Sequence, residues 1–263
     1  MENHRVYFRN GQEVLALGQG TYRMGNSSAD KSEEIKALRT GIELGMQVID
    51  TAENYDNEEL VGEAIRGLRD RVFLVSKVQP SHAVRQGTII TSCERSLRKL
   101  HTDFLDLYLL HWEGRSSFEE TVSAMLKLQQ DGKIKMWGVS NMDVHKMERF
   151  YVIPGGNTCA ANQVAYNIET RGTEFDLLPW CTQRKVVFMA YSPIGEGDLI
   201  RNRTLMEIGK RHNATAAQIA LAWSLRLPNI LSIPKAGSVR HVEENFKSLS
   251  ILLTNEDIRD LNS

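Results

Sequence analysis

The chain has 263 residues, with 32 basic against 33 acidic side chains and a formal net charge of −1. A net charge so close to zero argues against nucleic acid as the main partner, because phosphate binding needs a basic face. No apolar stretch approaches the ~20 residues that span a bilayer, and the N-terminus lacks the apolar core of a signal peptide, so we expect neither a membrane span nor secretion.

The first predicted element is a β-hairpin, with strand-like residues 6–8 and 14–17 and the favoured turn pair Asn10-Gly11 between them. From residue 46 onward, short runs rich in Val, Ile, Leu and Phe alternate with amphipathic patterns. Both alternating sets of positions in these runs are apolar, which is typical of parallel strands that are buried on both faces. Eight strands are expected, near residues 15–20, 46–50, 72–76, 104–110, 134–139, 158–163, 186–191 and 230–233.

Helices are predicted between these strands. Ile89, Cys93 and Leu97 share one helical face, and capping boxes begin at Thr215 and Thr254. Alternating βα units with no break in composition predict an α/β chain, folded over residues 1–263 as one (β/α)8 TIM barrel with an N-terminal β-hairpin. A doubly wound open sheet is the alternative, since periodicity alone does not distinguish the two.

Most predicted strands end on a polar side chain. In a (β/α)8 barrel, the carboxyl ends of the strands meet around one mouth, and active sites are built there. This pattern predicts an enzyme. The residues concerned are Asp50, Lys77, His111, Ser140, Asn141, Gln163, Tyr191 and Lys235.

Two common kinds of site are disfavoured. Gly18-Gln19-Gly20 begins a GxGxxG pattern, but Arg23 stands where a Rossmann fold needs its third glycine. The seven histidines show no ligand spacing such as HExxH, so no metal is expected. The three cysteines form no CxxC motif and cannot all pair, which predicts a reducing, cytoplasmic location. A monomer is favoured.

A series of short motifs runs along the chain in a fixed order. They are GQGT at 18–21, DTAENY at 50–55, NEELVG at 57–62, SKV at 76–78, DFLDLYLLHW at 103–112, GVSN at 138–141, NQ at 162–163, AYSP at 190–193 and IPK at 233–235. Taken together, these motifs resemble those of the aldo-keto reductases over nearly the whole chain. Segments around His111-Trp112 and Lys235 look closest to bacterial members that reduce methylglyoxal and other small or aromatic aldehydes.

The resemblance implies a catalytic tetrad of Asp50, Tyr55, Lys77 and His111. A free phenol has a pKa of ~10 and is a poor acid at neutral pH, so Tyr55 needs the Lys77 ammonium to lower its pKa. Asp50 is expected to keep Lys77 charged and oriented. His111, as a neutral donor, is expected to hold the substrate carbonyl oxygen beside Tyr55.

The resemblance also implies an NADPH site across the barrel mouth, with NADH as a possible substitute. Tyr191 is expected to stack on the nicotinamide and Lys235 to meet the 2′-phosphate. His241 stands where the family commonly has an arginine, which weakens the expected preference for NADPH. The other residues assigned to the cofactor are Gly20, Thr21, Ser140, Asn141, Gln163, Ser192, Ile194, Glu244 and Asn245.

Tyr22, Met24 and Trp112 project from the loops that should form the substrate walls. The chain stops soon after its last helix, so an open, permissive pocket is expected. The predicted function is NADPH-dependent reduction of aldehydes or reactive dicarbonyls to alcohols (EC 1.1.1.-). Two alternatives stay open: an NADPH-binding sensor or scaffold with vestigial catalysis, and a Schiff-base aldolase that uses Lys77 or Lys235.

Overall fold

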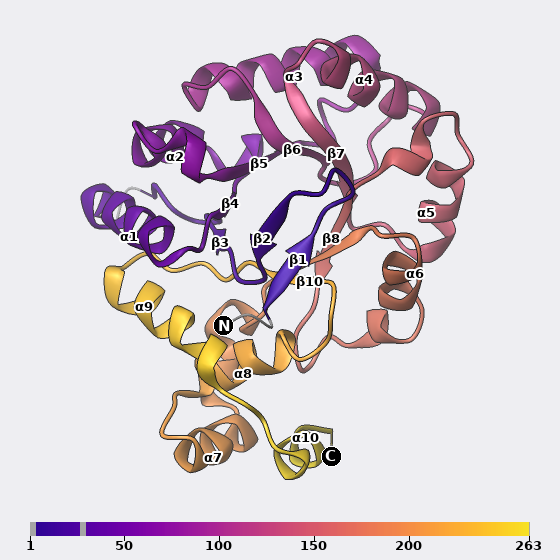
Figure 1. Cartoon of the computed structure of the whole chain (residues 1–263). Helices are drawn as coiled ribbons and strands as arrows, with labels where there is room; N and C mark the ends of the chain where they lie inside the picture. Colours follow the sequence, from indigo (N-terminus) through magenta and orange to yellow (C-terminus); the bar gives the residue numbers. More distant parts are fainter. Residues whose placement is uncertain (1–3, 27–29, 263) are drawn as a thin grey trace.

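The computed structural model describes residues 4–26 and 30–262, which form a barrel of strands surrounded by helices (Figure 1). The strands are β1 Arg5–Tyr7, β2 Glu13–Leu15, β3 Gln19–Gly20, β4 Val48–Asp50, β5 Phe73–Val78, β6 Leu105–Leu110, β7 Ile134–Ser140, β8 Ala161–Ala165, β9 Val187–Tyr191 and β10 Ile230–Ser232. The α-helices are α1 Lys31–Leu44, α2 Glu58–Ile65, α3 Gln86–Lys99, α4 Phe118–Gln130, α5 Val144–Tyr151, α6 Leu177–Gln183, α7 Arg203–Arg211, α8 Ala216–Ser224, α9 Val239–Lys247 and α10 Asn255–Asn262.

The parallel sheet runs in chain order from β3 to β10 and closes on itself. Gly18 N donates to Ser232 O at 2.8 Å, and Gly20 N donates to Pro234 O at 2.9 Å, so the first strand pairs with the last. A β-carbon on Gly20 would lie 2.7 Å from Ile233 O, and only glycine permits this approach. The expected (β/α)8 barrel is confirmed, and the open-sheet alternative is wrong because the two edges are hydrogen-bonded.

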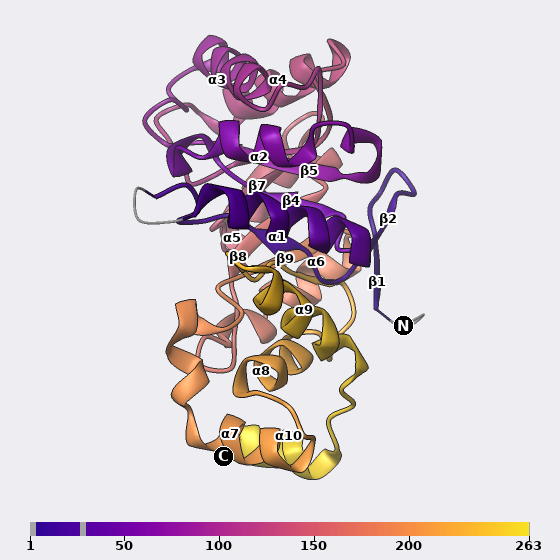
Figure 2. The same cartoon turned by 90° about the vertical axis from the view of Figure 1, so that its left-hand side faces the viewer.

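The N-terminal hairpin is confirmed, but its turn is longer than a two-residue Asn-Gly turn. Phe8 N donates to Gln12 O, and Gly11 N donates to Phe8 O, both at 2.9 Å. Gly11 alone in this turn has a positive φ, +83°. The phenyl ring of Phe8 stacks on Phe73 with centroids 4.7 Å apart, so the hairpin covers the amino-terminal end of the barrel (Figure 2).

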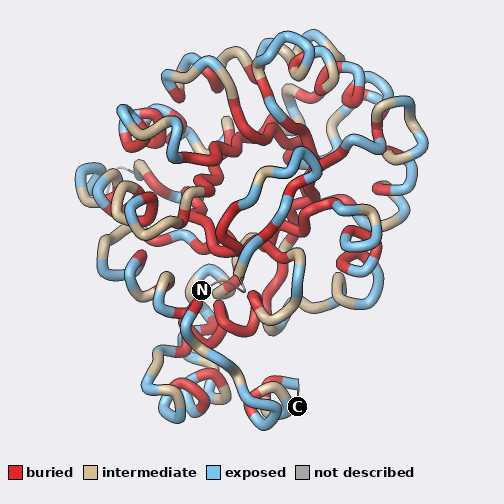
Figure 3. The backbone as a smooth tube through the Cα atoms, viewed as in Figure 1, coloured by how far each residue is buried: buried red, intermediate tan, exposed pale blue. Residues whose placement is uncertain are grey.

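Strand parity decides which side chains enter the barrel. In β5, Phe73 and Val75 belong to the core inside the barrel, whereas Leu74 and Val78 pack outward against the helices. Because side chains alternate along a strand, Lys77 shares the inward face. The same period-2 rule gives inward positions to four other predicted site residues: Asp50 after Val48, His111 after Leu109, Gln163 after Ala161 and Tyr191 after Met189. Figure 3 shows that the barrel strands are largely buried, as a ring around the centre of the molecule.

Strand boundaries differ most from expectation at two places. The first predicted strand, 15–20, is divided. Residues 13–15 form the second strand of the hairpin, paired with residues 5–7, and only Gln19–Gly20 form β3. The sixth, 158–163, begins instead at Ala161, because residues 156–158 form a 3₁₀ turn. Hydrophobicity identified both segments, but it could not separate backbone pairing from a turn.

The C-terminal helix α10 is attached through Asp257, as its capping box predicts. The Asp257 carboxylate accepts hydrogen bonds from Thr254 N at 2.8 Å and from His212 Nε2 at 2.7 Å, and it pairs with Arg211 Nη2 at 2.9 Å. Although burial opposes ionisation, these partners lower the pKa of Asp257 to about 2. The ionised Asp257 carboxylate therefore helps to hold the start of α10 to Arg211 and His212.

We expect Asp257→Asn to lower the free energy of unfolding at pH 7 by about 2 kcal/mol. A carboxylate with a lowered folded-state pKa contributes above its unfolded value of about 3.9, and the contribution is lost as pH falls toward 2. The difference between wild type and variant in urea unfolding should therefore shrink below pH 4. Glu256→Gln, at an exposed carboxylate 3.7 Å from Arg211, is the control with little expected effect. Equal effects of the two substitutions would contradict this account.

Candidate active site

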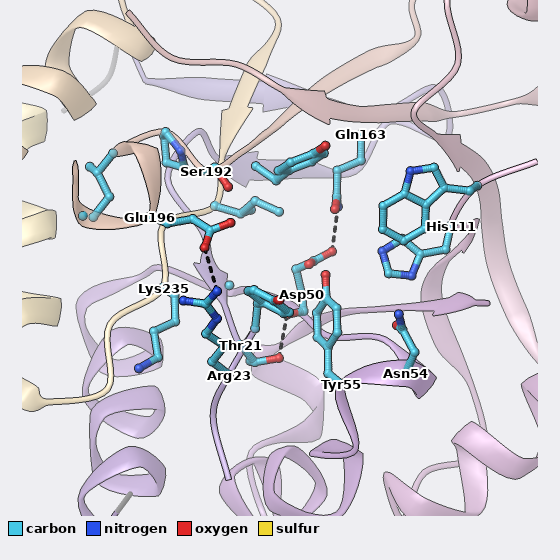
Figure 4. Close-up of a pocket in the computed structure, with 18 residues that line it drawn as sticks. Thr21, Arg23, Asp50, Asn54, Tyr55, His111, Gln163, Ser192, Glu196 and Lys235 are labelled. Carbon is cyan, nitrogen blue, oxygen red and sulfur yellow. Dashed lines mark hydrogen bonds and ion pairs between the residues drawn. The ribbon is translucent and has the colours of Figure 1, made fainter. Parts of the chain in front are cut away.

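The carboxyl ends of the strands surround a pocket of about 560 Å³ (Figure 4). This volume lies within the usual range for small-molecule sites. Predicted site residues that line it come from both ends of the chain. They are Gly20, Thr21, Tyr22, Asp50, Tyr55, His111, Trp112, Gln163, Tyr191, Ser192, Ile194 and Lys235.

Lys77 and Asp50 form a buried ion pair beneath this pocket. Lys77 Nζ lies 2.6 Å from Asp50 Oδ2 and donates to Thr51 O at 2.8 Å, and no part of the Lys77 side chain is exposed. Burial lowers the pKa of Lys77, but Asp50 and Tyr55 outweigh burial and leave that pKa above its ordinary value. Lys77 is therefore an ammonium at neutral pH, as predicted.

The Tyr55 hydroxyl lies next to this ion pair. Lys77 Nζ lies 3.5 Å from Tyr55 Oη, and it also sits 4.9 Å from the centre of the ring. Burial raises the pKa of Tyr55 more than Lys77 lowers it. Lys77 thus acts on the pKa of Tyr55 in the expected direction, but the net shift is upward because desolvation disfavours phenolate more strongly. Tyr55 keeps its proton at neutral pH, and Lys77 lies where it can stabilise the anion that remains after the proton leaves.

His111 is held neutral beside Tyr55. Burial and the Lys77 charge lower the pKa of His111 to about 2. The ring lies 5.7 Å from that of Tyr55 and stacks on Trp112 at 3.9 Å. His111 Nδ1 is buried and finds no hydrogen-bond partner in the described part of the chain. Because an unpaired buried donor is costly, we assign the proton to Nε2, which makes this nitrogen the donor.

A polar network joins the tetrad to the next strands. Gln163 Nε2 donates to Asp50 Oδ1 at 2.7 Å, so both Asp50 oxygens are used. Tyr191 Oη donates to Asn141 Oδ1 at 2.9 Å, and Asn141 Nδ2 donates to the His111 carbonyl at 3.1 Å. Ser140 Oγ donates to the Gln163 carbonyl at 2.7 Å. Gln163 and Asn141, both assigned to the cofactor, thus contact the tetrad directly, and Ser140 contacts Gln163.

The far side of the pocket has the features that a dinucleotide requires. Tyr191 presents a half-buried ring, and Lys235 presents an exposed ammonium on the opposite side from His111 (Figure 4). The carboxylate of Glu34 lies 3.9 Å from Lys235 Nζ, which leaves the ammonium able to meet a phosphate. These residues fit a nicotinamide dinucleotide.

The Aldo/keto reductase family model matches residues 16–263. The chain belongs to the aldo/keto reductase family. It is 47% identical over 266 residues to methylglyoxal reductase YeaE of Escherichia coli (strain K12), covering 98% of this chain and 93% of that protein. It is 34% identical to glyoxal reductase of Bacillus subtilis (strain 168), covering 96% and 90% of the two chains.

Solved structures of aldo-keto reductases match as closely. The structure from Klebsiella pneumoniae in complex with NADPH has a TM-score of 0.96 at 46% identity, covering 100% of this chain and 95% of that chain. A second Klebsiella pneumoniae structure, with NADP and acetate, has a TM-score of 0.95 at 46% identity, with 99% and 94% covered. As a member of the family, the protein is an NADPH-dependent oxidoreductase.

Not every assigned residue of this aldo-keto reductase faces the pocket. Met24 is 1% exposed and packs in the core between barrel and helices, so its assignment as a substrate wall is wrong. Its loop turns inward after Tyr22 because Asn57 Nδ2 holds the carbonyls of Thr21 and Met24. Ser140 and Asn141 lie behind the pocket wall, while His241, Glu244 and Asn245 lie on α9 beyond the pocket.

The pocket also includes residues that the motifs did not single out. Arg23 and Glu196 form an ion pair at 3.1 Å that joins the loops after β3 and β9 across the mouth. Asn54, directly before Tyr55, lines the reacting end. Asn54 could have been found from its place inside the DTAENY motif, whereas no sequence signal paired Arg23 with Glu196. Pro193, Gly197 and Ile233 complete the lining.

Neither a membrane-spanning helix nor a cluster of metal-binding side chains occurs in residues 4–26 and 30–262, the part of the chain that the structure describes. No helix there is long and apolar enough to cross a membrane. Within the same residues, no group of three or more His, Cys, Asp or Glu side chains is arranged to hold a metal ion.

Proposed function

We propose that the protein reduces small aldehydes and 2-oxoaldehydes such as methylglyoxal to alcohols, with Tyr55 as the proton donor. The observation that carries this proposal is the buried line Asp50–Lys77–Tyr55, with separations of 2.6 and 3.5 Å, which opens onto the pocket beside His111. The similarity to methylglyoxal and glyoxal reductases supports the substrate class.

Each member of the tetrad has a definite role in this reaction. His111 Nε2–H and the Tyr55 hydroxyl both donate to the substrate carbonyl oxygen and so fix its position. NADPH supplies the hydride to the carbonyl carbon when bound. Tyr55 transfers its proton to the oxygen as negative charge develops there, and Lys77 stabilises the phenolate that remains. Asp50 keeps Lys77 charged and aimed at Tyr55.

The walls favour a small, flat substrate. Trp112 and Tyr22 are exposed to 42% and 47%, and both line the pocket close to Tyr55. An aromatic wall beside the carbonyl accommodates apolar or planar groups without requiring a particular polar pattern. We therefore propose that aromatic aldehydes are accepted alongside methylglyoxal.

The aldolase alternative is disfavoured by the state of Lys77. A Schiff-base lysine attacks as the neutral amine, whereas Asp50 keeps Lys77 protonated. Lys235 lies across the pocket from His111, on the far side from the tetrad (Figure 4). The sensor alternative is disfavoured by the complete tetrad, since a pure binding site has no need of an activated acid.

Lys235 should decide the preference for NADPH over NADH. We expect Lys235→Met to reduce the ratio of NADPH to NADH affinity by about tenfold or more, because a charge-assisted contact to the 2′-phosphate is lost. The measurement is the Kd for each cofactor by fluorescence titration. Lys247→Met, at an exposed lysine in the last turn of α9, is the matched control. An unchanged ratio in Lys235→Met would move the phosphate site elsewhere.

We propose that residues 1–263 work as one domain, as a monomer in the cytoplasm. Burial raises the pKa of the thiols of Cys93 and Cys159 to about 12, and Cys181 is likewise a buried free thiol. Buried, protonated thiols with no structural disulfide fit a reducing compartment.

A further inference from the structure

Asn54, the residue directly before Tyr55, presents an amide that the protein itself does not use. It is exposed and lines the pocket with Tyr55, His111 and Trp112. No hydrogen bond from its side chain to another described residue occurs. Figure 4 shows this side chain extending toward the same part of the pocket as His111. Asn54 is therefore available to a molecule at the reacting end.

The backbone segment that carries Asn54 is held in place by hydrogen bonds of its two neighbours. Glu53 Oε1 accepts a hydrogen bond from Gln79 N at 2.6 Å, and Glu53 Oε2 accepts from Arg95 Nη2 at 2.9 Å. On the other side, Tyr55 N donates to Ala52 O at 3.0 Å. The short 3₁₀ helix Glu53–Tyr55 is thus held at both ends, which keeps the backbone of Asn54 at the rim of the pocket that Tyr55 also lines.

Two other polar side chains of this region are already engaged. Asn57, the next amide along the chain, donates to Thr21 O at 2.6 Å and accepts from Thr51 Oγ1 at 2.7 Å. The Arg23 guanidinium pairs with Glu196 at the mouth. A substrate held by Tyr55 and His111 therefore meets aromatic walls, including Trp112, and the unengaged amide of Asn54.

We propose that Asn54 determines specificity by binding a second oxygen on the carbon next to the reacting carbonyl. Its amide N–H donates to this oxygen and so selects 2-oxoaldehydes over simple aldehydes of equal length. A neutral amide suits a neutral carbonyl oxygen, whereas a carboxylate is usually matched by an arginine fork. The proposal rests on the reductase function proposed above, and it names the residue that recognises the dicarbonyl class.

Three-carbon aldehydes provide the test, because they differ only at the neighbouring carbon. Propanal has no second oxygen, 2-hydroxypropanal has a hydroxyl that can donate or accept, and methylglyoxal has a carbonyl that can only accept. In Asn54→Leu, which has a similar volume, we expect the kcat/KM ratio of methylglyoxal to propanal to fall about tenfold, the loss of one good hydrogen bond.

Asn54→Asp separates hydrogen-bond donation from polarity. An ionised aspartate only accepts, so it should lose the preference for methylglyoxal while keeping a preference for 2-hydroxypropanal, whose hydroxyl can donate to it. This opposite response of two oxygenated substrates would not arise from a general loosening of the pocket.

Three results would decide against the inference in different ways. Unchanged substrate ratios in both variants would overturn the role of Asn54 and leave the reductase function intact. A loss of NADPH affinity in Asn54→Leu, measured by fluorescence, would assign the residue to the cofactor site and also overturn the proposal. If wild type reduced none of the three aldehydes, the proposed function itself would fail.

Discussion

Replacing Tyr55 by phenylalanine should reduce kcat for methylglyoxal by about 10²–10⁴-fold, the usual contribution of a positioned general acid. The variant keeps the ring that packs near Tyr22 and His111 but loses the proton and the oxygen that Lys77 faces. NADPH binding should persist, because no atom assigned to the cofactor is removed. Steady-state kinetics and a fluorescence titration of NADPH measure the two effects separately.

Tyr108→Phe is the matched control for Tyr55→Phe. Tyr108 is fully buried on the outward face of β6, and its hydroxyl has no hydrogen-bond partner in the described residues. Removal of this hydroxyl should leave kcat nearly unchanged. If both substitutions lowered kcat alike, or if Tyr55→Phe retained turnover, the assignment of Tyr55 as the acid would be wrong.

Replacing Lys77 by methionine should damage both catalysis and stability. Loss of the ammonium removes the group that stabilises the Tyr55 phenolate, and we expect kcat to fall about 10²–10³-fold. It also leaves the Asp50 carboxylate buried without its counter-charge, and breaking a buried pair in this way costs about 3–5 kcal/mol of folding free energy. Urea unfolding and methylglyoxal kinetics should therefore both change.

The double variant Asp50→Asn/Lys77→Met separates these two effects. It removes the unpaired charge, so much of the lost stability should return while kcat stays low. Lys135→Met, at a half-exposed lysine 3.0 Å from Asp106, is the control for the loss of an ion pair near the surface, and it should cost about 1 kcal/mol or less. Full recovery of kcat in the double variant would contradict the role of Lys77.

Much of the fold could be predicted because strand burial and side-chain alternation are local properties. The apolar runs gave the order of the strands, and the period-2 rule places Asp50, Lys77 and His111 on the same inward face as the barrel core. The mouth of a parallel barrel then brings together residues that are far apart in sequence. Their pattern was enough to predict most of the lining of the pocket.

Other features depend on tertiary contacts that no local pattern encodes. Met24 was expected in the pocket, but Asn57 holds its loop so that this side chain turns into the core. The Arg23–Glu196 pair depends on how two loops meet across the mouth. The direction of the Tyr55 pKa depends on the balance between burial and the charge of Lys77, which requires the packed structure.

The central claim is that this aldo-keto reductase converts a small carbonyl compound to an alcohol at the expense of NADPH. The most direct test is to incubate the wild-type protein with NADPH and methylglyoxal, and to measure both the NADPH consumed and the alcohol formed. The account predicts one alcohol for each NADPH, as hydride transfer requires. Tight binding of NADPH without consumption, for methylglyoxal and for an aromatic aldehyde alike, would contradict it and favour a sensor.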